Sequence, residues 1–328
     1  MTTVLYHMVS SSALVSLGLY NLISTTRNYL KFPHTYAAKL FHPFPFPTTT
    51  LRHVPIYLTL LSLFLSIIHQ LILSFYPDPL LKGHTPVHRL TSLHFATLLF
   101  LFLLLSLLIL FSDSLSFDNS LLFALSSALF ALHSNASSTA SALQTSALEA
   151  HCLLVSARLS AIISFLCLIL AAMPKLFSAD AALSASLILR GLWTFQTGLS
   201  LHADAFIPEG CHRLLDVVNG VEGSTQCDLD ESKLRAVALL DLAFLLQVVV
   251  VVVVVFATYA IVAKSVGARR LGSYEALPTN SNSGDANHQS VVLYGISIQV
   301  SYDGHQHHKY IASGPAFEKV TSESCTVC

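Results

Sequence analysis

The chain has 328 residues, of which 53% are hydrophobic and only 11% are charged, and its formal net charge is −1. Soluble domains average about a quarter charged residues, so this composition excludes an ordinary soluble protein and is typical of a multi-pass integral membrane protein. The near-neutral charge offers no basic face for nucleic acid, and we therefore expect the lipid bilayer to be the main partner.

Seven hydrophobic segments of membrane-spanning length follow one another along the chain. Each is expected to be an α-helix, because unpaired strand edges are too costly in lipid and a spanning helix needs about 20 residues. The seventh is the clearest, and Ser126, Ser127 and His133 dilute the fourth. The sequence thus predicts an all-α fold, a seven-transmembrane-helix bundle over residues 1–263. The approximate spans are Val4–Ser24, Leu51–Phe75, Arg89–Phe111, Asp118–Ala136, Ala147–Met173, Ala181–Ala203 and Ala236–Ala263.

Two further stretches have the composition of connections rather than spans. Lys31–Thr50 holds four prolines, which forbid a long helix, and its aromatic residues suit the headgroup zone. Residues 264–328 are rich in Ser, Gly, Asn and His, and are predicted to be a mostly disordered tail through which protein partners bind. The last four residues, Cys325–Cys328, have the C-a-a-X form of a prenylation signal with an unusual terminal Cys.

Lysine and arginine residues set the expected orientation, because cytosolic loops carry an excess of them. With a non-cytosolic N-terminus, eight of them flank the cytosolic ends of the segments and five flank the opposite ends. We therefore expect a cytosolic C-terminus, in the plasma membrane or an endomembrane. The cytosolic set is Arg27, Lys31, Lys39, Arg52, Lys175, Lys264, Arg269 and Arg270, and the other set is Lys82, Arg89, Arg213, Lys233 and Arg235.

On this topology, ionisable residues from all seven segments lie toward the non-cytosolic leaflet. Two interpretations stay open. Each group alone can reach the headgroup boundary and be satisfied by water, whereas the set as a whole favours a shared polar cavity. The polar-layer candidates are His7, His69, His94, His133, Glu149, His151, His202 and Asp241.

Two arginines lie deeper, Arg158 in the middle of the fifth segment and Arg190 in the middle of the sixth. An arginine at that depth is expected to be a buried charge that faces the bundle, and Glu149 and Asp241 are the candidate partners of Arg190. The sixth segment also has a small-residue face suited to close helix contact, formed by Gly191, Thr194 and Gly198.

A histidine-rich layer with acidic groups is compatible with more than one chemistry. Neutral imidazole ligates zinc and haem iron, and chains of His and carboxylate groups relay protons. No segment carries the histidine pair at i and i+4 that is typical of a zinc-binding helix, and no nucleophile elbow, phosphate loop or dinucleotide motif is present. We therefore assign no catalytic residue, leave the metal unknown, and keep zinc and haem as alternatives that are not favoured.

The cysteines divide into two groups. Cys152 and Cys167 lie within the fifth segment and are expected to be packing residues. Cys211 and Cys227 bracket a loop on the non-cytosolic side, where a disulfide is chemically permitted. We predict that these two pair and fold the loop over residues 204–235.

Five short motifs occur in an order that points to one family. They are Leu93–Thr97 (LHFAT), Leu132–Ser134 (LHS), Glu149–His151 (EAH), Arg190–Trp193 (RGLW) and Pro208–His212 (PEGCH). Over residues 1–265 the chain resembles the transmembrane protein 45 family, in the plant branch described as viral-response membrane proteins. The resemblance implies a seven-helix integral membrane protein with no established biochemical activity.

Three functions stay open on these observations. The favoured one is a non-enzymatic membrane protein that acts in signalling, trafficking or defence through partners, because no complete catalytic set is visible. The second is a metal- or haem-dependent membrane enzyme or redox carrier that uses the histidine layer. The third is an ion- or proton-coupled transporter, against which the odd number of helices and the lack of an internal repeat count.

Overall fold

The computed structural model describes residues 2–43, 53–75, 85–115, 117–216, 221–272, 288–293, 296–301 and 311–312. The chain divides into two compact units, Met1–Ser273 and Tyr274–Cys328. The C-a-a-X sequence at Cys325–Cys328 and the basic residues Arg52 and Lys82 lie outside the described residues.

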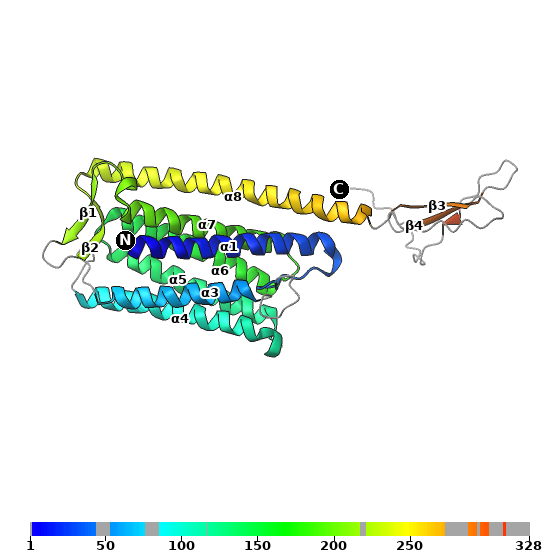
Figure 1. The fold of residues 1–328 in the computed structure, drawn as a ribbon, viewed down its shortest axis with the longest axis horizontal. Coiled ribbons are helices and arrows are strands. Elements are labelled where there is room, and N and C mark those ends of the chain that lie inside the picture. The colour runs from blue at the N-terminus through cyan, green and yellow to red at the C-terminus, as the bar shows by residue number, and fades with distance from the viewer. Residues whose placement is uncertain are drawn as a thin grey trace, which may run out of the picture. The chain divides into compact units, whose positions relative to one another are not determined.

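The described part of the first unit contains seven α-helices, which run side by side along a common direction (Figure 1). The helical nature of all seven predicted segments is thereby confirmed. Short 3-10 helices, η1 (Pro33–Thr35) and η2 (Asp204–Phe206), lie in the connections. The α-helices are α1 (Thr2–Lys31), α3 (Val54–Leu73), α4 (Thr85–Leu115), α5 (Asn119–Leu143), α6 (Ala147–Ala172), α7 (Phe177–His202) and α8 (Asp230–Gly272).

Five of these helices are long and apolar enough to cross a membrane. Helices α5 and α7 carry too many polar residues to be among them, so the crossing of these two stays a prediction. The five candidate spans are Thr3–Lys31, Val54–Leu73, Val87–Ser112, Ala147–Ala172 and Asp230–Gly267.

Several helices are longer than the hydrophobic pattern predicts, α5 and α8 among them. The α5 helix begins after Asp118, whose side chain caps it by accepting from the Ser120 backbone N–H at 3.2 Å, and it continues to Leu143 because Ala and Ser tolerate a helix. At 43 residues, α8 is about 65 Å long, about twice the thickness of a hydrocarbon core of about 30 Å.

The centre of the bundle is formed by α1, α5, α6 and α7. Phe123 of α5, Ile163 of α6 and Leu187 of α7 meet in one buried cluster. Helices α1 and α7 approach closely, because a Cβ added to Gly191 would lie 3.0 Å from the Val15 backbone N and one added to Gly198 would lie 2.5 Å from the His7 Cβ. The predicted small-residue contact face is confirmed at these two glycines.

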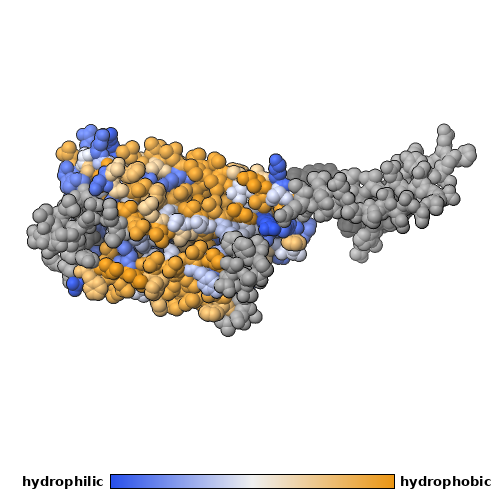
Figure 2. Space-filling model, viewed as in Figure 1, coloured by the Kyte–Doolittle hydropathy of each residue, from blue (hydrophilic) through white to orange (hydrophobic). Residues whose placement is uncertain are grey.

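The outer surface of the bundle is mainly apolar. Figure 2 shows hydrophobic residues over the middle of the visible face of the helices, with hydrophilic residues gathered at both ends. Large apolar side chains of α3, α4 and α8 are exposed, including Phe64, Phe100 and Phe256, which are 54%, 48% and 71% exposed. Such a belt is suited to contact with lipid chains.

An antiparallel hairpin lies beside the N-terminal end of α1 (Figure 1). It consists of β1 (Cys211–Asp216) and β2 (Val221–Cys227), with Cys211 opposite Cys227 and an irregularity in register between Arg213 and Leu215. The second unit contains β3 (His288–Leu293), β4 (Ile296–Ser301) and β5 (Ile311–Ala312), which form one antiparallel sheet. Residues 264–272 of the predicted tail belong to α8, and the disorder predicted for the rest of residues 264–328 stays a prediction.

Candidate functional site

The predicted polar layer divides into separate groups in the structure. At the end of the bundle that holds the N-terminus of α1, the His7 ring stacks on the His202 ring with centroids 5.6 Å apart. The neighbouring Tyr6 ring stacks on His69 of α3 at 4.1 Å. The Nδ1 atoms of His7 and His69 are buried without a hydrogen-bond partner among the described residues. Three of the predicted histidines are therefore brought to one place by α1, α3 and α7.

A second group joins α6 to α8. The His151 Nε2 lies 2.9 Å from the Asp241 Oδ1, and the two side chains are 18% and 60% exposed. Glu149, two residues before His151, accepts from the Gln144 Nε2 at 3.0 Å. The contact between His151 and Asp241 joins α6 to α8, whereas the ring contacts of His7, His69 and His202 join α1, α3 and α7.

Two members do not join the layer. His94 is exposed on α4, and the one ring contact found for it among the described residues is with its neighbour Phe95, whose ring lies roughly parallel with its centroid 6.4 Å away. His133 lies near the middle of α5 rather than near its end, because the helix continues to Leu143. His133 therefore lies deeper in the bundle than the layer requires, and His94 faces outward, while its depth in the layer stays a prediction.

His133 meets Arg190 at the level of the middle of the bundle. An Arg190 Nη2 lies 3.1 Å from the His133 Nε2, Nη1 donates to the Ser160 hydroxyl, and the guanidinium carbon lies 5.9 Å from the Phe130 ring centre. Because a guanidinium only donates, the His133 nitrogen that faces it must be an unprotonated acceptor. We therefore assign the neutral imidazole to His133.

The expected surroundings of the two deep arginines need correction. Arg190 is paired with a serine and a histidine rather than with an acidic residue, since Asp241 and Glu149 are engaged by His151 and Gln144. Arg158 was expected to be a buried charge, but its side chain is exposed on the outward side of α6. Position within a segment therefore identifies the depth of an arginine and leaves its direction open.

Serine side chains connect α5 and α6 below and above His133. The Ser134 hydroxyl donates to the Ala157 carbonyl at 2.8 Å, and Ser164 donates to the Ser127 carbonyl at 2.8 Å. The Ser137 and Ser160 hydroxyls lie 3.2 and 3.3 Å from the His133 Nδ1. These contacts explain why the polar residues of α5, which weaken its hydrophobic pattern, face another helix.

The opposite end of the bundle holds a buried carboxylate that sequence reasoning missed. Asp180, 4% exposed in the first turn of α7, accepts from the Tyr36 hydroxyl at 2.5 Å and from the Thr25 hydroxyl at 3.1 Å. Burial, together with the neighbouring carboxylate, raises the pKa of the Tyr36 hydroxyl, so that it remains a donor. Asp180 lies one residue before the predicted segment, and an acid at the first turn of an apolar helix was the available signal.

A cavity of about 130 Å³ adjoins Asp180. It lies between the α3–α4 pair and helices α1, α5, α6 and α7, and most of its wall is apolar. An engineered cavity of about 150 Å³ holds one benzene molecule, so this one holds a group of similar size. The polar atoms of its wall come from Asn21, Lys39, Thr59, Ser106, Ser126, Asp180 and Ser184.

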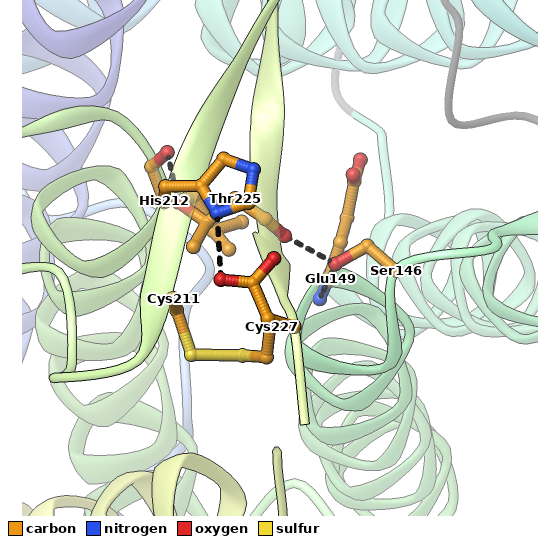
Figure 3. The surroundings of a disulfide bond; sticks show 8 residues. Ser146, Glu149, Cys211, His212, Thr225 and Cys227 are labelled. Carbon is orange, nitrogen blue, oxygen red and sulfur yellow. Dashed lines mark hydrogen bonds and ion pairs between the residues drawn. A yellow bond between two sulfur atoms is a disulfide. The ribbon is translucent and has the colours of Figure 1, made fainter. Parts of the chain in front are cut away.

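A disulfide joins Cys211 to Cys227 and closes the β1–β2 hairpin. Figure 3 shows the hairpin against α6, where the Ser146 hydroxyl donates to the Thr225 carbonyl at 2.6 Å. The Thr225 hydroxyl in turn donates to the Leu201 carbonyl of α7 at 2.9 Å. The hairpin thus closes the ends of α6 and α7, while Cys152 and Cys167 are free and buried in the core.

No metal-binding constellation is formed by the described residues, because no three or more His, Cys, Asp or Glu side chains among them lie close enough together. The histidines at His7, His69 and His202 come nearest to one, since they lie at the same end of the bundle and two of them have a buried unpaired nitrogen.

Residues 119–260 match a family model with the description Family of unknown function (DUF716), the family that includes transmembrane protein 45. The matched stretch runs from the start of α5 into α8 and contains four of the five motifs named above, from Leu132–Ser134 to Pro208–His212. No curated protein matches the chain in sequence.

Proposed function

We propose that this chain is a seven-span integral membrane protein, related to the transmembrane protein 45 proteins, that acts by binding partners in signalling, trafficking or defence. One observation carries the seven-span proposal. Several polar residues that lower the hydropathy of α5 and α7, namely Ser134, Arg190 and Asp180, face neighbouring helices instead of the outer surface. A spanning helix tolerates such residues where they are buried in protein.

The proposed orientation has the N-terminus outside the cytosol. A disulfide persists in an oxidising compartment, and the Cys211–Cys227 hairpin lies at the same end of the bundle as the start of α1 (Figure 1). The opposite end carries Arg27, Lys31 and Lys175, in keeping with the excess of basic residues on the cytosolic side.

Glycosylation mapping tests the orientation. An acceptor sequence added before Thr2 is expected to be glycosylated in microsomes, whereas the same sequence added after Cys328 is expected to remain unmodified. Protection of the N-terminal acceptor, together with modification of the C-terminal one, would reverse the proposed orientation. Modification of both would contradict an odd number of spans.

The second unit is the proposed place for partner contacts, because it is a compact unit separate from the helices. Deletion of residues 274–328 is expected to leave insertion and thermal stability of the bundle unchanged and to abolish cross-linked complexes of the chain in cells. A bundle that no longer inserts, or complexes that persist after the deletion, would contradict this division of roles.

A metal- or haem-containing protein is the second candidate. The observation in its favour is the pair of buried, unpartnered Nδ1 atoms of His7 and His69 beside His202. Visible absorption and elemental analysis of the purified protein separate the two candidates. A Soret band or stoichiometric zinc that His69→Ala removes would establish the second, and trace metal that this variant leaves unchanged would argue against it.

A further inference from the structure

The cavity beside Asp180 presents hydrogen-bond acceptors to its interior. Among the described residues, only Tyr36 and Thr25 donate to the Asp180 side chain, both to Oδ2, and no cation forms an ion pair with it. The Oδ1 atom therefore has capacity for another donor. Asn21 belongs to the same wall, and its Oδ1 atom is buried with no hydrogen-bond partner in the part of the chain that the structure describes.

The hydroxyl groups of the wall add only acceptors. Each donates its hydrogen to a backbone carbonyl one turn earlier in its own helix, which leaves the oxygen lone pairs for the cavity. These bonds are Thr59 to Pro55 at 2.8 Å, Ser106 to Phe102 at 2.9 Å, Ser126 to Leu122 at 2.8 Å and Ser184 to Asp180 at 3.1 Å.

Burial disfavours a charge on the Asp180 carboxylate, whereas the hydrogen bonds that it accepts from Tyr36 and Thr25 favour the ionised form. The carboxylate lies at the N-terminus of α7, where the helix dipole favours negative charge, and its 2.5 Å contact with the Tyr36 hydroxyl has the length of a charge-assisted hydrogen bond. A carboxylate so deeply buried is normally paired with a cation. Lys39, which also lines the cavity, is exposed and forms no ion pair with Asp180.

We propose that this cavity binds a small organic amine, whose ammonium group meets Asp180 and Asn21 and whose apolar body fills the space between Phe123 and Leu187. An ammonium supplies three donors and a positive charge to a wall of acceptors. The predominantly apolar wall and the volume of about 130 Å³ favour a body of about the size of a benzene ring over a hydrated metal ion. This binding site is additional to the proposed partner contacts of the second unit.

Thermal unfolding of the purified full-length protein tests the proposal, because a ligand that binds only the folded state raises the melting temperature with its concentration. Phenethylamine is expected to raise it saturably near neutral pH. Phenethyl alcohol, which has the same apolar body and no charge, is expected to have little effect at the same concentration. Equal effects of the two, or no effect of the amine, would overturn the proposal.

Variants locate the binding. Asp180→Asn is expected to weaken phenethylamine binding about tenfold or more, because hydrogen bonds to charged groups are the strong ones. Asn21→Leu removes an oxygen that has no partner, so it is expected to fold and to weaken binding as well, which keeps the test decisive if Asp180→Asn unfolds. Lys39→Gln is expected to tighten binding by removing a like charge.

The matched control is Asp118→Asn, since Asp118 is an exposed carboxylate outside the cavity. Its phenethylamine affinity is expected to equal that of the unmodified protein. Unchanged affinity in both Asp180→Asn and Asn21→Leu would place the amine elsewhere. If sodium chloride raises the melting temperature and prevents phenethylamine from binding, the Asp180 carboxylate binds an inorganic cation instead. Either result would overturn the proposal, and neither bears on the number of spans.

Discussion

Helices α7 and α8 show that burial within the bundle and hydropathy do not rise together. The α7 helix has eleven buried residues, Asp180 and Trp193 among them, but is too polar to be a candidate span. The α8 helix is the most hydrophobic candidate span, with mean hydropathy 2.9, and only Ala236, Leu240 and Val251 are buried in its first 30 residues. High hydropathy is thus typical of a helix that faces lipid, whereas buried polar residues are typical of a helix that packs against other helices.

The largest contrast is expected between glycines of these two helices. Gly191→Leu should destabilise the bundle by about 3 kcal/mol, because even a Cβ there would lie 3.0 Å from the Val15 backbone N. Gly267→Leu, on α8, should have almost no effect, since nothing lies within 4 Å of an added Cβ. Thermal unfolding in detergent measures both, and equal losses would contradict the close α1–α7 contact.

The next effect concerns the hairpin that closes α6 and α7. Cys211 and Cys227 are 16 residues apart, and a disulfide that closes a loop of that length contributes about 2–3 kcal/mol. Reductant should therefore lower the melting temperature of the unmodified protein and leave the double variant Cys211→Ser/Cys227→Ser unchanged. If Cys152, Cys167, Cys211 and Cys227 are all alkylated without reductant, no disulfide is present.

The two deep arginines give a smaller contrast. Arg190→Leu leaves the His133 nitrogen and the Ser160 hydroxyl without their donor, a loss of about 1–2 kcal/mol in a membrane bundle. Arg158→Leu replaces an exposed side chain and should be neutral or slightly stabilising. If Arg190→Leu has the stability of the unmodified protein, the guanidinium is not held inside the bundle.

The smallest effect is a pH dependence at the end of the bundle opposite the hairpin. Burial, and next the Lys39 charge, lower the pKa of His42 from 6.5 to about 4, so the unfolded chain binds the proton more readily. The contribution of neutral His42 to the free energy of unfolding is therefore fully present above about pH 6.5 and is lost as the pH falls toward about 4. The loss amounts to about 1 kcal/mol between about pH 7.5 and about pH 5.5. His42→Phe should remove this loss, and His34→Gln, at an exposed histidine, should retain it.

The hydrophobic pattern was sufficient to predict each α-helix in the described part of the first unit, because each long apolar run is a continuous helix. Direction around a helix was harder to predict. His94 and Arg158 turn outward while His133 and Arg190 turn toward each other, and only the packing of neighbouring helices decides this.

The remaining features depend on contacts that are distant in the sequence. Asp180 gains its role from Thr25 and Tyr36, which lie 155 and 144 residues away. The β1–β2 hairpin is held by Ser146, the N-cap residue of α6, which is 79 residues from Thr225. A local pattern contains no information about such partners, so the acceptor-lined cavity became visible only in the structure.

The central claim is that the polar helix α5 crosses the membrane as the apolar helices do. Phe117→Cys and Thr145→Cys place exposed thiols at its two ends, and labelling of sealed vesicles with a membrane-impermeant maleimide, read by mass spectrometry, reports the side of each. If α5 spans the bilayer, Thr145→Cys is labelled from the non-cytosolic side and Phe117→Cys from the cytosolic side. Labelling of both from the same side would show that α5 does not span the bilayer and would contradict the seven-span bundle.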